Sequence, residues 1–164
     1  MAQVASIGVR KLIDILSGPE GLQPALAGLA NDMGVEPSAV AAAIVAGQNV
    51  AAEVLEKSAG AGYPSMQVYC ERVVNSLREK FRTFSGKARM VVEARVSQDR
   101  IEGIEAKLQL YVDAATQVLD GNRGDWGQGM FYTGGYEVSY SPVRHGGRNF
   151  LQTAKVVFEI DISK

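Results

Sequence analysis

The chain of 164 residues contains one histidine, His145, and one cysteine, Cys70. A single histidine cannot build a multi-histidine metal site, and it leaves no second base for a Ser-His-Asp triad. His145 lies in a glycine-rich turn between Arg144 and Arg148, where we expect a surface or interface contact. Cys70 occupies an apolar position of a predicted strand, which favours a buried, unreactive thiol. These residues predict no catalytic site, no metal and no cofactor, and we expect a protein that is not an enzyme.

The glycine-rich segment 121–129, GNRGDWGQG, does not fit a nucleotide-binding loop. It lacks the Lys-Ser/Thr pair that contacts phosphates, and it precedes a predicted strand rather than a helix. We interpret it as a flexible turn that Trp126 holds in place. The tripeptide Arg-Gly-Asp at 123–125 is too short to indicate adhesion.

Residues 72–100 form a basic segment in a chain whose net charge is −1. Eight basic side chains stand against three acidic ones, which gives this segment a local charge of +5. The basic residues are Arg72, Arg78, Lys80, Arg82, Lys87, Arg89, Arg95 and Arg100. Together with Arg144 and Arg148 on a neighbouring turn, they could form a surface for DNA phosphates or for an acidic protein. The alternative is a solvated strand face without a partner.

A single domain over residues 1–164 suits this length and an apolar fraction of 46%. Apolar residues at helical spacing predict an N-terminal helix, which Ser-Gly-Pro ends, so that this unit covers residues 1–18. Residues 19–62 hold twelve alanines and one basic residue. They predict a small helical insertion, with a helix from Pro37 to about residue 57, or alternatively a flexible linker. We expect no signal peptide and no membrane span.

Residues 64–162 are expected to form the core of sheet and helix. A period of two predicts strands at residues 66–70 and 87–97, and two long strands within residues 130–162. In residues 87–97 the positions 88, 90, 92, 94 and 96 are apolar, and most of the positions between them are charged.

One helix is expected between these strand pairs. Asp99 and Glu102 have the spacing of a capping box, and apolar residues follow every three or four positions from Ile101 to Leu119. Gly121 is expected to end the helix in the left-handed conformation. The order of elements predicts an α+β fold with an antiparallel or mixed four-stranded sheet packed by helices.

Five stretches of this core carry a resemblance to a known family. They are QVYCER (67–72), FRTFSG (81–86), RMVVEARVS (89–97), FYTGGYEV (131–138) and HGGRNFLQTAKV (145–156). Taken with the order of elements, they resemble the tail terminator (tail-completion) proteins of long-tailed bacteriophages. The resemblance covers about three-fifths of the chain.

The resemblance implies an α+β subunit that assembles into a ring, usually a hexamer, without enzymatic activity or cofactor. Such a ring caps the finished tail tube, ends its polymerisation and offers a joining surface to the head-side connector. We accordingly expect a virion protein at the head-proximal end of the tail, assembled in the host cytoplasm and without a membrane partner. If DNA passes through the ring, basic residues could line the lumen.

On this hypothesis the loops 81–87 and 143–149 meet neighbouring molecules. The expected contact residues are Arg82, Phe84, Lys87, Arg144, His145 and Arg148. One alternative is a head–tail neck or connector (head-completion) component, which would bind DNA-filled heads rather than isolated tails. Another is a small nucleic-acid-binding module, whose DNA affinity would fall steeply with salt. The segment 19–62 is longer than the resemblance leads us to expect.

Overall fold

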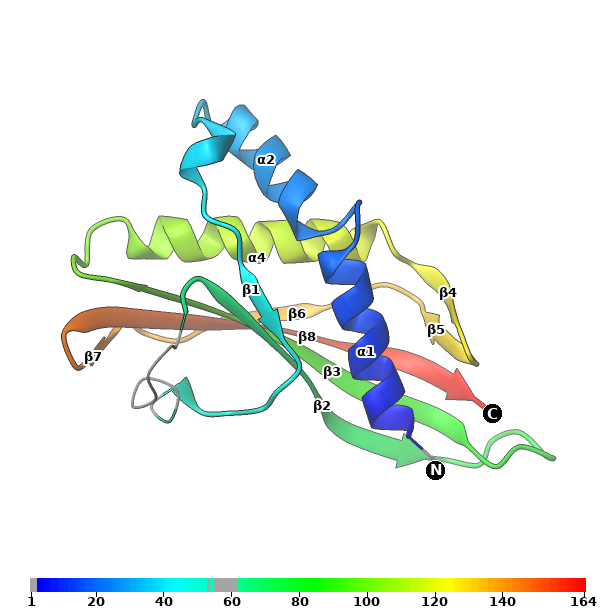
Figure 1. Ribbon diagram of the computed structural model, residues 1–164. Coiled ribbons are helices and arrows are strands. Elements are labelled where there is room, and N and C mark those ends of the chain that lie inside the picture. The colour runs from blue at the N-terminus through cyan, green and yellow to red at the C-terminus, as the bar shows by residue number, and fades with distance from the viewer. Residues whose placement is uncertain (1–2, 53, 55–61) are drawn as a thin grey trace.

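Two long antiparallel strands, β3 (Ser85–Gln98) and β8 (Asn149–Ser163), form the middle of a curled sheet. Figure 1 shows the computed structural model, which describes residues 3–52, 54 and 62–164. The two strands pair along the whole of β3, from Ser85 opposite Ser163 to Gln98 opposite Phe150. The apolar positions 88, 90, 92, 94 and 96 of β3 are all buried, which confirms the register predicted from the period of two.

The remaining strands extend this pair on both sides. β2 (Ser65–Asn75) runs antiparallel to β3, and β1 (Ile44–Ala46) runs parallel to the first residues of β2. On the other side, β5 (Met130–Tyr132), β6 (Glu137–Tyr140) and β7 (Arg144–Gly146) pair with successive parts of β8, and β4 (Gly124–Gly127) pairs with β5.

The α+β class is thus confirmed, but the sheet differs from the four-stranded one that we predicted. The described residues form a mixed sheet of eight strands. Part of the difference arises at Gly134 and Gly135, whose φ values of 95° and 84° break the predicted strand 131–140 into β5 and β6.

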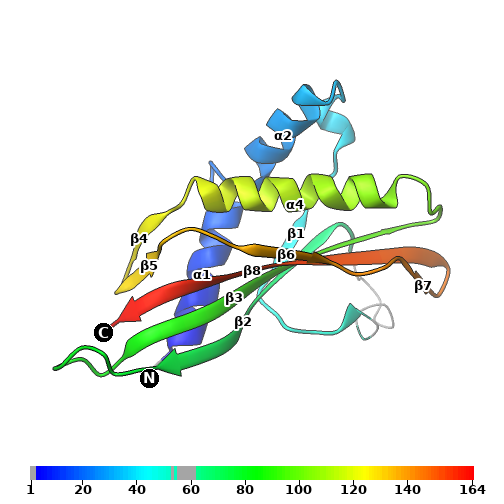
Figure 2. The same cartoon turned by 180° about the vertical axis from the view of Figure 1, so that it is seen from behind.

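Helices cover one face of the sheet. The described residues form three α-helices, α1 (Val4–Ser17), α2 (Leu22–Asp32) and α4 (Ile104–Asp120). Figures 1 and 2 show α1 and α4 lying on the sheet, with α2 farther out against α4. The apolar stripe of α4 is buried, as its spacing predicted, through Ile104, Leu108, Val112, Ala115 and Leu119.

Both predicted ends of α4 are wrong. The helix begins at Ile104, not after a capping box at Asp99, because the chain turns at Gly103 with a φ of 80°. The side chain of Gln98 donates to two carbonyl groups of this turn, at 2.7 and 2.8 Å. Gly121 has a φ of −79°, so it is right-handed and does not form the left-handed cap.

The predicted helix from Pro37 onward is also wrong. Pro37 opens only the short 3-10 helix η1 (Pro37–Ala39), and the chain then extends into β1 because its backbone pairs with β2. Before Pro37, the described residues of the alanine-rich segment form the helix α2, which we did not predict. Residues 55–57, the end of the predicted helix, lie outside the described residues.

Candidate assembly surfaces

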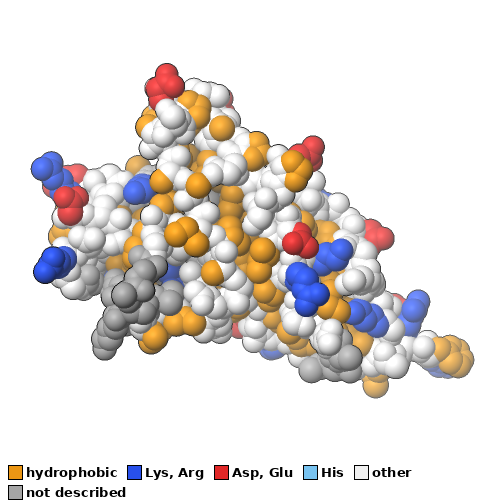
Figure 3. Space-filling model, in the orientation of Figure 1, with side chains coloured by type: hydrophobic (Ala, Val, Ile, Leu, Met, Phe, Trp, Pro, Cys, Tyr) orange, Lys and Arg blue, Asp and Glu red, His pale blue; other side chains and the backbone are white. Residues whose placement is uncertain are grey.

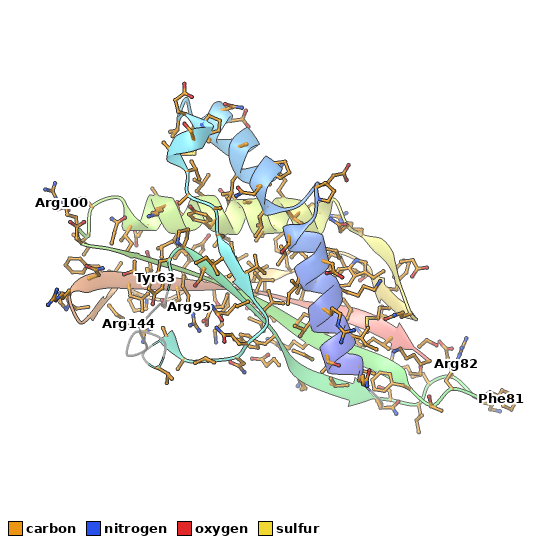
Figure 4. The ribbon with its side chains drawn as sticks, viewed as in Figure 1. Tyr63, Phe81, Arg82, Arg95, Arg100 and Arg144 are labelled. Carbon is orange, nitrogen blue, oxygen red and sulfur yellow. The ribbon has the colours of Figure 1, made fainter. Side chains whose placement is uncertain are left out.

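The predicted contact residues lie at the two ends of β3 and β8. The end with the β2–β3 loop, here called the hairpin end, holds Arg82, Phe84 and Lys87. The end with β7 and the turn into β8, here called the turn end, holds Arg144, His145 and Arg148. The 14 residues of β3 separate these ends by about 45 Å. Figure 4 shows Arg82 and Arg144 at opposite ends and Arg100 at the same end as Arg144, so the expected basic surface does not extend from the hairpin end to the turn.

The loop 76–84 projects beyond the sheet at the hairpin end. Phe81 is 103% exposed at its tip and Leu77 is 61% exposed. Figure 4 labels Phe81 at the far end of this loop, and Figure 3 shows hydrophobic and basic side chains together there. Both residues have positive φ, 68° for Phe81 and 47° for Leu77, which costs about 1–2 kcal/mol per residue with a Cβ. An apolar ring held in water on a strained backbone favours a contact with another molecule.

Hydrogen bonds hold the base of this loop. Asn75 Oδ1 accepts from the N–H groups of Leu77 (3.2 Å) and Ser85 (3.0 Å), and Asn75 Nδ2 donates to Thr83 O (3.2 Å). Phe84 is only 1% exposed and belongs to the core, so it anchors the loop and does not lie on the surface. The tip is thereby presented by a fixed base.

Four of the eight basic residues of the segment 72–100 form ion pairs, and two of these, Lys87 and Arg89, pair with acids outside the segment, which lower its charge below +5. Lys87 Nζ lies 3.2 Å from Glu159 and 3.9 Å from Asp161. Arg89 lies 2.8 Å from Glu71. Arg82 and Arg95 are paired with Glu79 and Glu93. Within the described chain, Arg72, Arg78, Lys80 and Arg100 form no ion pair. The local charge of +5 therefore does not translate into an equally basic surface.

The pairing around Glu93 is buried, which the sequence did not indicate. Arg95 is 3% exposed and Glu93 is 8% exposed, on the sheet face opposite to the helices. Arg95 also donates through Nη2 to Val50 O, because the chain after β1 crosses this face, and Lys155 Nζ lies 3.9 Å from Glu93. The pair fastens the segment after β1 to the sheet.

The turn end is exposed. Arg144, His145 and Arg148 all lie on the surface there. The His145 ring packs edge-on against Phe150, with ring centroids 5.1 Å apart. This contact holds the imidazole in place at the exposed turn.

The described residues offer no set of groups for metal binding. No group of three or more His, Cys, Asp or Glu side chains among them could hold a metal ion. Cys70 is half-buried, and burial raises the pKa of its thiol, so the thiolate is disfavoured at neutral pH. In the same part of the chain, no helix is long and apolar enough to cross a membrane.

Comparison with models of protein families and with curated proteins gave no match to this chain. The features of the described residues that bear on function are an exposed loop at each end of the central strands and the open edges of the sheet.

Proposed function

We propose that this protein is a structural component of a phage virion whose copies form a ring that caps the tail tube. The ring ends tail polymerisation on one side and offers the head-joining surface on the other. The observation that carries the proposal is the placing of exposed loops at opposite ends of a sheet that, within residues 3–52, 54 and 62–164, is open at both lateral edges.

The two edges of the sheet are suited to self-association. Among the described strands, β2 has no partner beyond Gln67 on its outer side, and β6 pairs only with β8. Successive pairs β2–β3, β3–β8 and β8–β6 are all antiparallel, so β2 and β6 run in opposite directions. Copies rotated about an axis along the strands can therefore join edge to edge, and such head-to-tail contacts close into rings.

In this ring the hairpin end and the turn end face opposite sides. One side contacts the tail tube protein and the other contacts the head-side connector or neck protein. Arg82 and Lys87 belong to the first surface, and Arg144, His145 and Arg148 to the second. A ring makes many weak contacts act together, so that modest loops are sufficient on each side. DNA passing through the lumen would meet whichever sheet face is turned inward.

A head–tail neck component remains the alternative, since it shares this logic of assembly. A free nucleic-acid-binding module is less favoured, because half of the basic residues that suggested it are neutralised within the chain.

Charge reversal at each end tests the proposal. We expect Arg144→Glu with Arg148→Glu to leave the monomer folded, because both side chains are exposed, and to abolish joining at one side of the ring. Arg78→Glu with Lys80→Glu is the matching double variant at the hairpin end. It should abolish joining at the hairpin side and leave joining at the turn side unchanged. The measurement is binding of each variant to isolated tails and to DNA-filled heads. Wild-type binding to both by both double variants would contradict the proposal, and binding to heads alone by the unmodified protein would favour the neck component.

A further inference from the structure

One open edge of the sheet lies beside an apolar groove. Beyond Gln67, the outer N–H and C=O groups of β2 are not paired with a strand in the described chain, and such groups accept a further strand. Next to this edge, α1 and residues 47–49 enclose a groove of about 580 Å³. Its apolar lining includes Val9, Ile13, Val68 and Cys70, and Arg10 lies at the groove as its one charged residue.

The opposite edge carries exposed tyrosines. Tyr140 at the end of β6 is 47% exposed, and Tyr136 just before β6 is 39% exposed. Tyr140 is paired with Ala154, whose side chain lies in the core, so the Tyr140 ring projects on the helix side of the sheet. The Tyr136 hydroxyl donates to Asp120 of α4 (3.3 Å), and Figure 2 shows β6 running below α4.

We propose that β6 of one copy adds to β2 of the next copy as an antiparallel strand, and that its Tyr140 fills the groove between α1 and β2. This inference rests on the ring proposed above and names its subunit contact. The groove lies on the helix side of β2, and the Tyr140 ring lies on the helix side of β6, so the two meet when the sheets are continuous. Tyrosine is a frequent anchor of protein interfaces because it buries a large ring at a small entropic cost.

The bulge in β2 sets the register. Cys70 pairs with Met90 and Arg72 with Arg89, so one extra residue, Glu71, lies between them. Cys70 therefore faces the helix side and Arg72 faces the opposite side.

An incoming β6 matches this arrangement when its Glu137 lies opposite Arg72. Val138 then lies opposite Cys70, and Tyr140 lies opposite Val68. All four side chains lie on the helix side of the sheet. A shift by one residue would turn Tyr140 away from the groove.

The charges of the two edges are complementary in this register. Arg72 and Glu137 are exposed, and neither forms an ion pair with a described residue, so each can neutralise the other across the contact. Burial, with Asp113 of α4 adding to it, raises the pKa of Tyr140, so this carboxylate accompanies Tyr140 to the groove, where Arg10 is the charged residue. The β6 edge of the chain thus carries both the aromatic ring and the acidic groups that complement the groove beside β2.

Disulfide trapping in the full chain tests this contact. Val138→Cys places a thiol opposite Cys70 of the next copy, at the short Cα separation of a cross-strand pair, which a disulfide can span. Copper–phenanthroline with oxygen oxidises the two thiols, taking two electrons and releasing two protons. Because every copy carries both thiols, we expect a ladder of covalent multimers up to the ring number on a non-reducing gel. A contact between two identical surfaces would stop at the dimer and would overturn the proposal.

Four variants make the result specific. Ser139→Cys, one residue along on the opposite face, should give at least tenfold less cross-linking. Cys70→Ser with Val138→Cys should give no ladder. Tyr140→Ser should raise the concentration needed for assembly by about tenfold or more, whereas Tyr140→Phe should keep it near the wild-type value.

Native mass spectrometry of the same samples separates the two proposals. A ring that forms while Val138→Cys gives no ladder, or gives no more than Ser139→Cys, would overturn this contact and leave the ring standing. Absence of any oligomer would overturn both.

Discussion

Replacing Phe81 by glycine should stabilise the folded monomer while removing the partner contact that we propose at the hairpin end. The Phe81 ring is fully exposed, so its removal loses no burial within the chain. Its φ of 68° costs about 1–2 kcal/mol for a residue with a Cβ, and glycine avoids this cost. The greater conformational freedom of glycine in the unfolded chain lowers the free energy of unfolding by about 0.5–1 kcal/mol. The expected net gain lies between about 0 and 1.5 kcal/mol in the free energy of unfolding.

Urea denaturation below the assembly concentration measures this gain, and thermal unfolding should show a Tm higher by about 2–4 °C per kcal/mol. Phe81→Ala is the control, because it removes the phenyl ring but keeps a Cβ on the strained backbone. We expect its stability to stay within about 0.5 kcal/mol of the original chain. Both variants should lose binding of a partner protein at the hairpin end of the proposed ring of subunits.

A loss of more than about 1 kcal/mol in Phe81→Ala would refute this reasoning. It would mean that the phenyl ring of Phe81 packs within its own chain and is not available for contact with a partner. Full partner binding by both variants would refute the functional half of the prediction.

Two further predictions concern the interior. Arg95→Met leaves Glu93 buried without its main partner and should cost about 3–5 kcal/mol in urea unfolding, whereas Arg95→Met with Glu93→Leu should recover most of that loss; equal destabilisation by both would contradict a buried pair. Burial, with Asp120 adding to it, raises the pKa of Tyr132 to about 12 from an ordinary 10, so the folded state resists ionisation and stability should fall as pH rises from about 10 to 12. Thermal unfolding across this range should show a smaller alkaline loss for Tyr132→Phe than for the original chain, and parallel curves would contradict the shift.

Periodicity in the sequence was sufficient for the central elements. The alternation in residues 87–97 predicted β3, and the helical spacing from Ile104 to Leu119 predicted the buried face of α4. These segments are long, and their periods are set by geometry alone, so one face is determined wherever it is buried.

The short strands could not be predicted in this way. β1 has three residues and pairs with β2 far along the chain, so its conformation is decided by a partner and not by its own alanine-rich sequence. The helix after Pro37 is predicted because proline suits the first position of a helix, but this local preference does not decide the conformation of the residues that pair with β2.

The buried pair of Glu93 and Arg95 escaped prediction for a related reason. Their positions alternate with the core residues of β3, as solvent-facing positions do, and only the crossing of the chain near Val50 buries them. For the contact surfaces, the sequence indicated the two loops but not their separation, which follows from the full-length pairing of β3 with β8.

The measurement that tests the central claim most directly is native mass spectrometry of the purified protein over a wide concentration range, with negative-stain imaging of the largest species. The proposed function predicts a closed ring, a hexamer above all. The fraction of the protein found in this ring should increase as the protein concentration rises. A monomer at every concentration, or open filaments in place of rings, would contradict it.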